Sequence, residues 1–470
     1  MPPTPRYAAL RESLSALAYD LAAFIQAKWT GDWAASPPAI GIHYSYWDLK
    51  ALPAYSNARD ELSKIPGIAD KYPAYGLDKP IGMFLELVVG SIPSPSYLEK
   101  AIEFWWSRFE SFLDAQVVPV RLFVGLGNFK ADRAEYRLNA EFAIRYMEDK
   151  SLDQIIEAEV AEPIPLPFEG TGVYHRIHGL IQIDFSVPAT RDSLESHLYT
   201  NECIRRMLAA EHTLRLSTFG RIVVGPWVPI CNASFPVDRV SAFGAPEEAD
   251  RFDEPAVQLD PDGWARFQAL HTLVANLVPR EAFIARARTP VQRRFNSAIS
   301  RFAETFDQGY WESVVVDLVI VMESLLTPNK QGGRMQLALA ASNLLGTSPP
   351  ECREIFDNIA AMYKLRNSSV HGEPMTHEEW DKNILKIAQT AGSPAQSLDD
   401  GARAYAFEAM RDYARRTISA MLHLSNAGRD PSSELTHHLH RLHLNPELRT
   451  AIQTEARTYP LASRPPPSVG

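Results

Sequence analysis

The sequence has few cysteines, no long apolar run and no secretory signal at its N-terminus, and each shortage excludes a class of protein. Its three cysteines, Cys203, Cys231 and Cys352, lack the paired spacing of zinc ribbons and redox motifs, which argues against a disulfide scaffold. The most apolar run, 314–322, contains Asp317, whereas a membrane-spanning helix needs about 20 apolar residues. We therefore expect a cytoplasmic protein without membrane contact.

The amino-acid composition is that of a globular protein. Of its 470 residues, 46% are hydrophobic and 22% are charged, near the averages of folded proteins, and this length predicts roughly two to four domains. The net charge of −10 means that any contact with nucleic acid must come from a local basic patch. No motif has the spacing of a metal or dinucleotide site, so we expect neither metal nor cofactor.

Residues 1–285 are expected to form a mixed α+β region of one or two subdomains. They carry 26 Lys or Arg against 37 Asp or Glu, so the acidity of the chain lies here. The acidic stretch 232–263 ends in Asp260-Pro-Asp-Gly263, which predicts a loop. Apolar periodicity predicts helices over 7–29, 96–115 and 191–214, and strands over 119–124, 138–144, 180–187, 221–224 and 227–230.

Residues 286–425 are expected to form an all-α bundle. The strand patterns stop after residue 286, and apolar residues then recur at helical spacing in several segments. Residues 426–470 are a tail, rich in histidine and then in proline, whose Pro-rich end we expect to be extended or disordered. The predicted helices span 291–306, 310–326, 333–345, 350–370 and 399–424.

One predicted helix carries a charge on its apolar face. The segment 348–372 opens with a capping box formed by Ser348 and Glu351. Its apolar residues recur every three or four positions until Arg366 takes the next place on that face. An unpaired buried charge costs several kcal/mol, so this guanidinium needs an anionic partner.

The sequence leaves two interpretations of Arg366 open. In the structural one, the guanidinium forms an ion pair with Asp317 or Glu323, two carboxylates of one otherwise apolar helix. In the functional one, Arg366 binds a phosphate and His371 transfers protons near neutral pH. Five residues along an ideal helix turn two side chains about 140° apart, so we expect the helix end at Gly372 to let the imidazole turn back toward Arg366.

The segment Arg366-Asn367-Ser368-Ser369-Val370-His371 resembles the R-x4-6-H motif of HEPN domains, with the polar residue after the arginine that many members have. The motif ends a late helix of the expected bundle, Tyr363 leads into it and Gly372 closes it. Together with the earlier segment 317–326, this pattern looks most like the Apea-like branch of that family. The resemblance covers about 290–425, less than a third of the 470 residues.

The resemblance implies an HEPN-like helical bundle and a metal-independent endoribonuclease, assembled as a homodimer whose two motifs face each other across one cleft. His371 would act as general base or acid, Arg366 would stabilise charge developing at phosphorus, and Asn367 would orient the phosphate or the imidazole. Attack by the RNA 2′-OH would leave a 2′,3′-cyclic phosphate. The supporting residues would be Asp317, Glu323 and Tyr363.

Such a protein would be a toxin or a phage-defence effector in abortive infection, with residues 1–285 sensing a phage-derived or cellular trigger or restraining the nuclease. Residues 286–425 carry 16 Lys or Arg and 16 Asp or Glu, so attraction for RNA needs a local patch. One run of arginines has no acidic residue within it and could contact the RNA backbone or form a solvated helix face. It comprises Arg286, Arg288, Arg293, Arg294 and Arg301.

The main alternative is a non-catalytic HEPN protein for dimerisation or interaction, in which Arg366 is a structural ion-pair residue. A third possibility, an accessory to a nucleotidyltransferase, would need that enzyme as a separate chain. No G-S motif followed by D-x-D occurs in this sequence.

Overall fold

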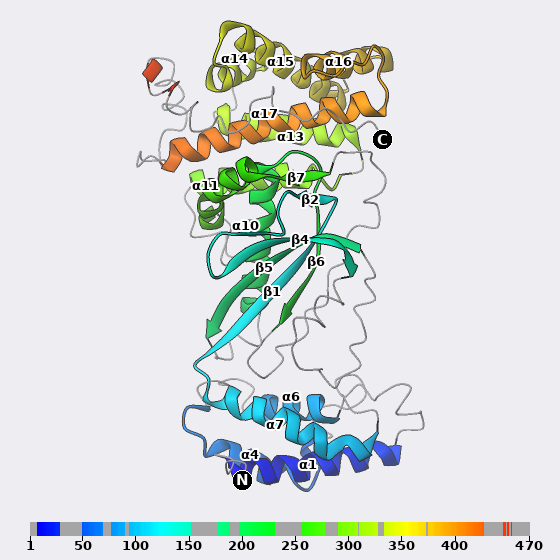
Figure 1. Cartoon of the computed structure of the whole chain (residues 1–470), viewed down its shortest axis with the longest axis vertical. Coiled ribbons are helices and arrows are strands. Elements are labelled where there is room, and N and C mark those ends of the chain that lie inside the picture. The colour runs from blue at the N-terminus through cyan, green and yellow to red at the C-terminus, as the bar shows by residue number, and fades with distance from the viewer. Residues whose placement is uncertain are drawn as a thin grey trace.

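The computed structural model describes most of the chain in three layers along one long axis (Figure 1). In the described part of the chain, helices form the N-terminal layer, a sheet with helices beside it forms the middle, and helices form the C-terminal layer. The described residues are 7–28, 49–68, 77–89, 94–151, 176–188, 197–230, 256–277, 290–308, 310–327, 333–372, 375–426, 445–447, 449–450 and 453.

Among its described residues, the N-terminal layer packs four helices around a shared apolar core. Helix α1 (Ala8–Lys28) contacts α4 (Tyr55–Ser63), α6 (Asp78–Val89) and α7 (Leu98–Asp114). One stripe of α1 is fully buried because its leucines recur every three or four residues. The structure confirms the helices predicted over 7–29 and 96–115. The stripe comprises Leu10, Leu14, Leu17 and Leu21.

The middle layer is a five-stranded antiparallel sheet in the order β3-β4-β5-β1-β6. In the middle of the sheet, Val120 and Leu122 of β1 lie opposite Phe185 and Ile183 of β5. Buried apolar side chains therefore alternate with polar ones along these two strands. A separate parallel pair joins β2 (Phe129–Ala131) to β7 (Val257–Leu259). The sheet strands are β1 (Val117–Gly127), β3 (Glu135–Arg137), β4 (Phe142–Ser151), β5 (Arg176–Pro188) and β6 (Val223–Ile230).

Two sequence predictions in this layer were wrong in part. The strand predicted over 138–144 begins only at Phe142, because 138–141 is the turn between β3 and β4, where Asn139 Oδ1 accepts the Glu141 N–H at 2.8 Å. The loop predicted over 232–263 lies outside the described residues as far as 255, and its end instead holds strand β7 and the start of helix α11 (Pro261–Leu277). There Asp260 Oδ1 accepts the Gly263 N–H at 2.6 Å, which is the bond of a helix N-cap.

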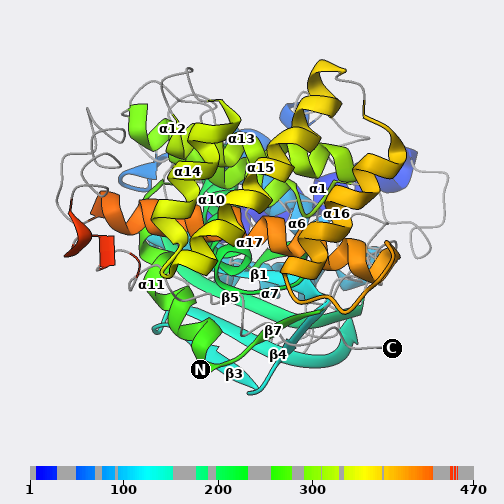
Figure 2. The ribbon, with the colours of Figure 1, turned by 90° about the horizontal axis from the view of Figure 1, so that it is seen from above.

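The C-terminal half is helical, as the sequence predicts. Five helices match the predicted segments to within two residues, and α16 (His377–Thr390) was not predicted. In Figures 1 and 2, α14, α15 and α16 lie at the end of the molecule farthest from α1, over α13 and α17. The five helices are α12 (Pro290–Glu304), α13 (Trp311–Leu326), α14 (Arg334–Leu345), α15 (Pro349–His371) and α17 (Asp400–Asn426).

The middle and C-terminal layers share a hydrophobic core. Ala209 and Leu216 of helix α10 (His197–Ser217) and Leu270 and Val274 of α11 belong to the same apolar cluster as the C-terminal helices. The boundary expected at residue 285 lies outside the described residues. Helices that precede it therefore extend into the core of the bundle that follows it.

A buried arginine joins these two layers by hydrogen bonds. Arg415 of α17 is 0% exposed and donates to Glu408 at 2.8 Å, to Asp412 at 3.2 Å and to the carbonyl oxygen of Arg215 in α10 at 3.0 Å. Glu408 also accepts the Gly220 N–H at 3.4 Å. Because its donors are satisfied on both sides, Arg415 fixes α17 against the middle layer.

None of the helices in the described part of the chain combines the length and apolar character that a membrane crossing requires.

Candidate functional site

The helix that carries the predicted motif starts as expected, with one difference. Ser348 is the N-cap of α15, and its hydroxyl accepts the Glu351 N–H at 3.4 Å. The Glu351 carboxylate does not close the capping box. It accepts instead from the Thr347 N–H at 2.8 Å and from Arg416 at 3.1 Å, and these partners hold the pKa of Glu351 below its usual value even though burial opposes this.

The buried face of α15 holds the helix against the bundle. Ile355, Ile359, Met362 and Leu365 are fully buried at helical spacing, and α15 contacts α13, α14 and α16. This packing fixes the backbone from which Arg366 projects one turn later.

His371 is the last residue of α15, and Gly372 ends the helix with a left-handed φ of 65°. The expectation that the imidazole leaves the helical register is therefore wrong, since His371 keeps it. The two side chains meet nevertheless, because the arginine side chain is long enough to reach along the helix toward its C-terminus.

The guanidinium contacts both polar residues of the motif. Arg366 Nη1 lies 3.0 Å from His371 Nε2 and 3.1 Å from Asn367 Oδ1. A guanidinium can only donate hydrogen bonds, so Nε2 must be the accepting nitrogen and the proton of the neutral ring lies on Nδ1. The site therefore presents a fixed cation beside an imidazole with a defined tautomer.

The two carboxylates predicted as partners of Arg366 behave differently. Glu323 Oε2 lies 3.8 Å from Arg366 Nη2, which is an ion-pair distance but too long for a hydrogen bond. Asp317 is buried and accepts instead from Arg301 at 2.5 Å and from Gln308 at 2.5 Å. The structure brings Glu323 to the site and pairs Asp317 with another helix.

The guanidinium retains unused donor capacity. Its side chain is 17% exposed, and its buried Nε has no hydrogen-bond partner among the described residues. The guanidinium carbon lies 5.7 Å from the centre of the Tyr363 ring, within cation–π range. The Tyr363 ring therefore lies beside the guanidinium of the site.

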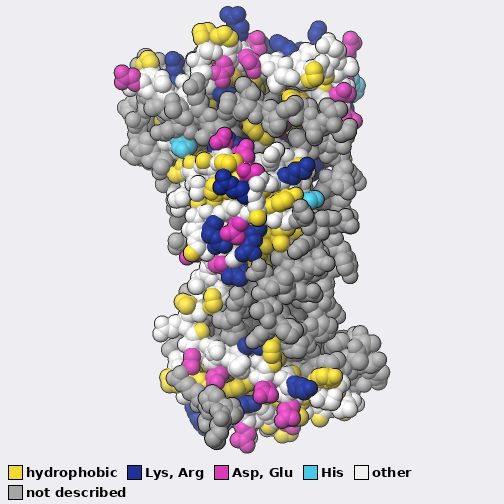
Figure 3. Space-filling model, in the orientation of Figure 1, with side chains coloured by type: hydrophobic (Ala, Val, Ile, Leu, Met, Phe, Trp, Pro, Cys, Tyr) yellow, Lys and Arg dark blue, Asp and Glu magenta, His cyan; other side chains and the backbone are white. Residues whose placement is uncertain are grey.

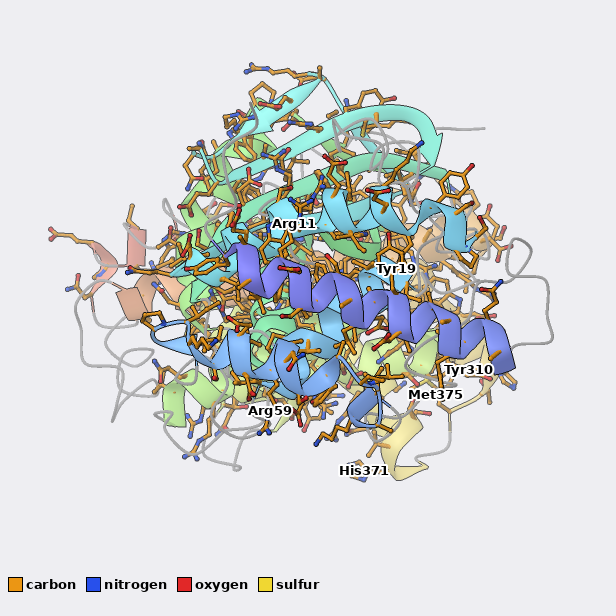
Figure 4. The ribbon with its side chains drawn as sticks, turned by 90° about the horizontal axis from the view of Figure 1, so that it is seen from below. Arg11, Tyr19, Arg59, Tyr310, His371 and Met375 are labelled. Carbon is orange, nitrogen blue, oxygen red and sulfur yellow. The ribbon has the colours of Figure 1, made fainter. Side chains whose placement is uncertain are left out.

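The motif lies at the surface of the molecule. His371 is exposed, and so is the neighbouring Val370 at 48%. Figure 4 shows His371 at the rim of the outline, at the end of its helix. The imidazole is therefore open to a polymeric substrate or to a second protein chain.

The predicted arginine run is not one surface. Arg301 bonds to Asp317 between α12 and α13. Arg293 is exposed and Arg294 is half-buried on α12. Arg286 and Arg288 lie outside the described residues. In the described ranges, no group of three or more His, Cys, Asp or Glu side chains could hold a metal ion.

A second group of polar residues, on the sheet and on helices α10 and α11, was not predicted from the sequence. It includes Arg205, Arg206 and His271, which line a cavity. Glu202 is followed by arginines three and four residues later, which is a helical charge pattern visible in the sequence. Nothing in the sequence placed His271 beside these residues.

Comparison with models of protein families, with curated proteins and with solved structures found no match for this chain. The candidate site therefore rests on the geometry of its own residues.

Proposed function

We propose that this protein is a metal-independent endoribonuclease of the HEPN type. The observation that carries the proposal is the 3.0 Å contact between Arg366 Nη1 and His371 Nε2 at an exposed helix end. A permanent cation and a titratable ring in contact are the two groups that phosphodiester cleavage through a 2′-OH requires.

The proposed reaction uses the RNA's own nucleophile. The 2′-oxygen loses its proton to a base and attacks phosphorus, the bond from phosphorus to the 5′-oxygen breaks, and the leaving oxygen gains a proton. The products are a 2′,3′-cyclic phosphate and a 5′-hydroxyl. Arg366 stabilises the charge that develops on the phosphoryl oxygens, and Asn367 orients the phosphate or the imidazole.

His371 becomes available as a base when substrate binds. In the free protein its Nε2 lone pair accepts a hydrogen bond from Arg366. A phosphate that takes the Arg366 donors frees Nε2 to accept the 2′-OH proton. The cation thus changes partner from a neutral ring to an anion, which is electrostatically favourable.

The reaction removes one proton and delivers another, which favours a site with two imidazoles. A homodimer that brings two copies of His371 to one cleft would supply both. Exposed apolar side chains on α14 and α15 are suitable contacts for such a dimer. They are Met335 at 59%, Leu339 at 54% and Val370 at 48% exposed.

The proposed biological role is that of a toxin or phage-defence effector, active in the cytoplasm. The acidic region 1–285 would restrain the nuclease until a phage-derived or cellular trigger arrives. The shared core and the Arg415 hydrogen bonds support this role, because they join the two halves of the chain by direct contacts.

One observation favours the alternative, a non-catalytic protein for dimerisation or interaction. Glu323 lies at ion-pair distance from Arg366, so the arginine could serve only to hold α15 against α13. This function requires Arg366 for stability and does not require His371.

The test is RNA cleavage in EDTA. Wild type should cleave labelled RNA, with a candidate trigger added if needed. Arg366→Ala should lower the rate roughly 10²- to 10³-fold, and His371→Ala roughly 10²- to 10⁴-fold. Matched controls are Arg353→Ala, an exposed arginine on the same helix, and His377→Ala, an exposed histidine. Cleavage that survives both motif substitutions, or that EDTA abolishes, would exclude this mechanism.

A further inference from the structure

A cavity lies beside the sheet, away from the Arg366 motif. Its larger part has a volume of about 530 Å³ and its smaller part about 220 Å³, and both are lined by Glu141 and Arg206. Cavities that bind small molecules measure roughly 300 to 1,000 Å³. The larger part alone is therefore large enough for a small organic ligand, and the smaller part adjoins it at Glu141 and Arg206.

The fold creates this cavity where one strand stops short. Among the described residues, β4 pairs with β5 only as far as Phe142 opposite Ile183, while β5 continues to Pro188 against β1. Helices α10 and α11 complete the cavity wall. Figure 3 shows Lys and Arg side chains gathered with Asp and Glu side chains over the sheet of the middle layer.

The α10 wall carries an excess positive charge. The Glu202 carboxylate accepts from both arginines, at 2.6 and 2.8 Å from Arg205 and at 2.6 Å from Arg206. The single negative charge of Glu202 is thus shared by the two positive charges of Arg205 and Arg206. Arg206 uses only its Nε in this bond, and no hydrogen bond joins its two Nη atoms to any described residue. Its guanidinium lies 4.5 Å from the centre of the Phe185 ring, and its side chain is 28% exposed.

The sheet side carries one ion pair and one further carboxylate, that of Glu141, which is exposed and lines both parts of the cavity. Arg121 Nε lies 2.7 Å from Asp184 Oδ1, and Asp184 Oδ2 also accepts from Gln182 at 2.8 Å. This pair lines the larger part of the cavity but adds no net charge. An anion that enters therefore finds its free donors on Arg206.

The smaller part of the cavity contains a histidine with a defined acceptor. The Thr213 hydroxyl donates its only proton to the Ala209 carbonyl at 2.6 Å, so its oxygen can only accept from His271 Nδ1, at 3.3 Å. His271 Nε2 then carries the lone pair, and it has no partner among the described residues. Burial lowers the pKa of His271 to about 4, so the ring is neutral at pH 7.

The walls around His271 suit a flat ring. The smaller hollow is lined by the apolar residues Leu138, Phe142 and Ile183, and also by Asn139 and Asn276. The imidazole itself is held by stacking on Phe267, with ring centres 5.1 Å apart and planes 15° apart. Apolar walls with a few fixed donors and acceptors recognise planar, hydrogen-bonding groups.

We propose that this cavity binds a ring-bearing phosphate monoester with the chemistry of a nucleoside monophosphate. The phosphate accepts from the free Nη groups of Arg206, and an N–H of the ring donates to His271 Nε2 in the smaller hollow. This site does not depend on the proposed nuclease activity, since it shares no residue with the Arg366 motif.

The test is calorimetric titration of the full chain with AMP, CMP, GMP and UMP. At least one nucleotide should bind saturably at one site per chain. Adenosine, which lacks the phosphate, and inorganic phosphate, which lacks the ring, should each bind at least about tenfold more weakly. Arg206→Ala should weaken nucleotide binding about tenfold or more, because it removes a charge-assisted hydrogen bond. His271→Phe keeps the stacked ring but should weaken binding roughly two- to tenfold.

Two surface variants keep the test independent of any folding defect. Thr272→Trp places an indole at an exposed position that lines the smaller hollow, and it should abolish binding. Gln268→Trp, one turn away on α11 and outside the cavity lining, should bind as wild type does, and so should Arg137→Ala. The proposal is overturned if no nucleotide binds at millimolar concentration, if Thr272→Trp leaves binding unchanged, or if inorganic phosphate binds as tightly as the nucleotides.

Discussion

Arg366 and Arg415 should respond very differently to truncation, although both lie on helices of the same core. Arg415 is 0% exposed and bonds two buried carboxylates, Glu408 and Asp412. Arg366 is 17% exposed, and its nearest carboxylate, Glu323, is 3.8 Å away. The comparison separates a structural arginine from one that is available to a ligand.

The magnitudes follow from these contacts. Arg415→Ala removes the cation that pairs with the buried Asp412 and leaves Glu408 with only Arg411, 3.6 Å away, which costs about 3 to 5 kcal/mol. Arg366→Ala loses a long ion pair worth at most about 1 kcal/mol. It also loses two hydrogen bonds, and the exposed His371 can replace its own with a bond to water. The expected loss for Arg366→Ala is therefore about 1 to 2 kcal/mol.

Urea unfolding followed by far-UV circular dichroism measures both variants, with Arg353→Ala as the control for loss of an exposed arginine from α15. Arg366→Ala should fold and unfold close to wild type, whereas Arg415→Ala should unfold at clearly lower urea. Equal destabilisation by the two substitutions would refute the reasoning and favour the structural ion pair with Glu323.

Three further predictions concern the end of α15, the Arg301–Asp317 pair and His271. Gly372→Ala should lower the free energy of unfolding by about 1 kcal/mol, since φ is 65° there, and no loss would contradict this C-cap. Arg301→Ala should cost about 1 to 3 kcal/mol by leaving Asp317 buried without its cation, and adding Asp317→Asn should recover part of it. The pKa of His271 is lowered from 6.5 to about 4 on folding. The part of the free energy of unfolding that depends on this shift, roughly 3 kcal/mol, is fully present above pH 6.5. It is lost as the pH falls toward 4, because the unfolded chain then binds a proton that the folded one does not. His271→Phe should flatten that dependence in urea unfolding at pH 7.5, 5.5 and 4.5, and an unchanged slope would contradict it.

Most of the fold follows from local patterns in the sequence. The predicted helices of the C-terminal half match because each buries a full stripe of apolar residues. Helix α16 escaped prediction because its buried stripe is short, comprising Ile384, Ile387 and Ala388. Its capping box, Thr376 with Glu379, is present in the structure and was the available signal. Asp260 was misinterpreted because Asp-Pro sequences open both turns and helices.

The residues of the candidate site could be predicted from the sequence, but their partners on other helices could not. Arg366, Asn367 and His371 lie in one short segment, so local geometry brings them together. The pairing of Arg301 with Asp317 depends on how α12 packs across α13. The spacing of residues within one helix does not determine that packing. The cavity with His271 is a tertiary feature in the same sense, since it joins residues from the sheet and two helices.

The end groups of the cleaved RNA test the central claim most directly. Mass spectrometry of fragments made by wild type in EDTA should find a 2′,3′-cyclic phosphate on one side of the cut and a 5′-hydroxyl on the other. Substitution of a single 2′-deoxynucleotide should block cleavage at that position. A 5′-phosphate with a 3′-hydroxyl, or cleavage at the deoxy position, would contradict attack by the 2′-OH under the control of Arg366 and His371.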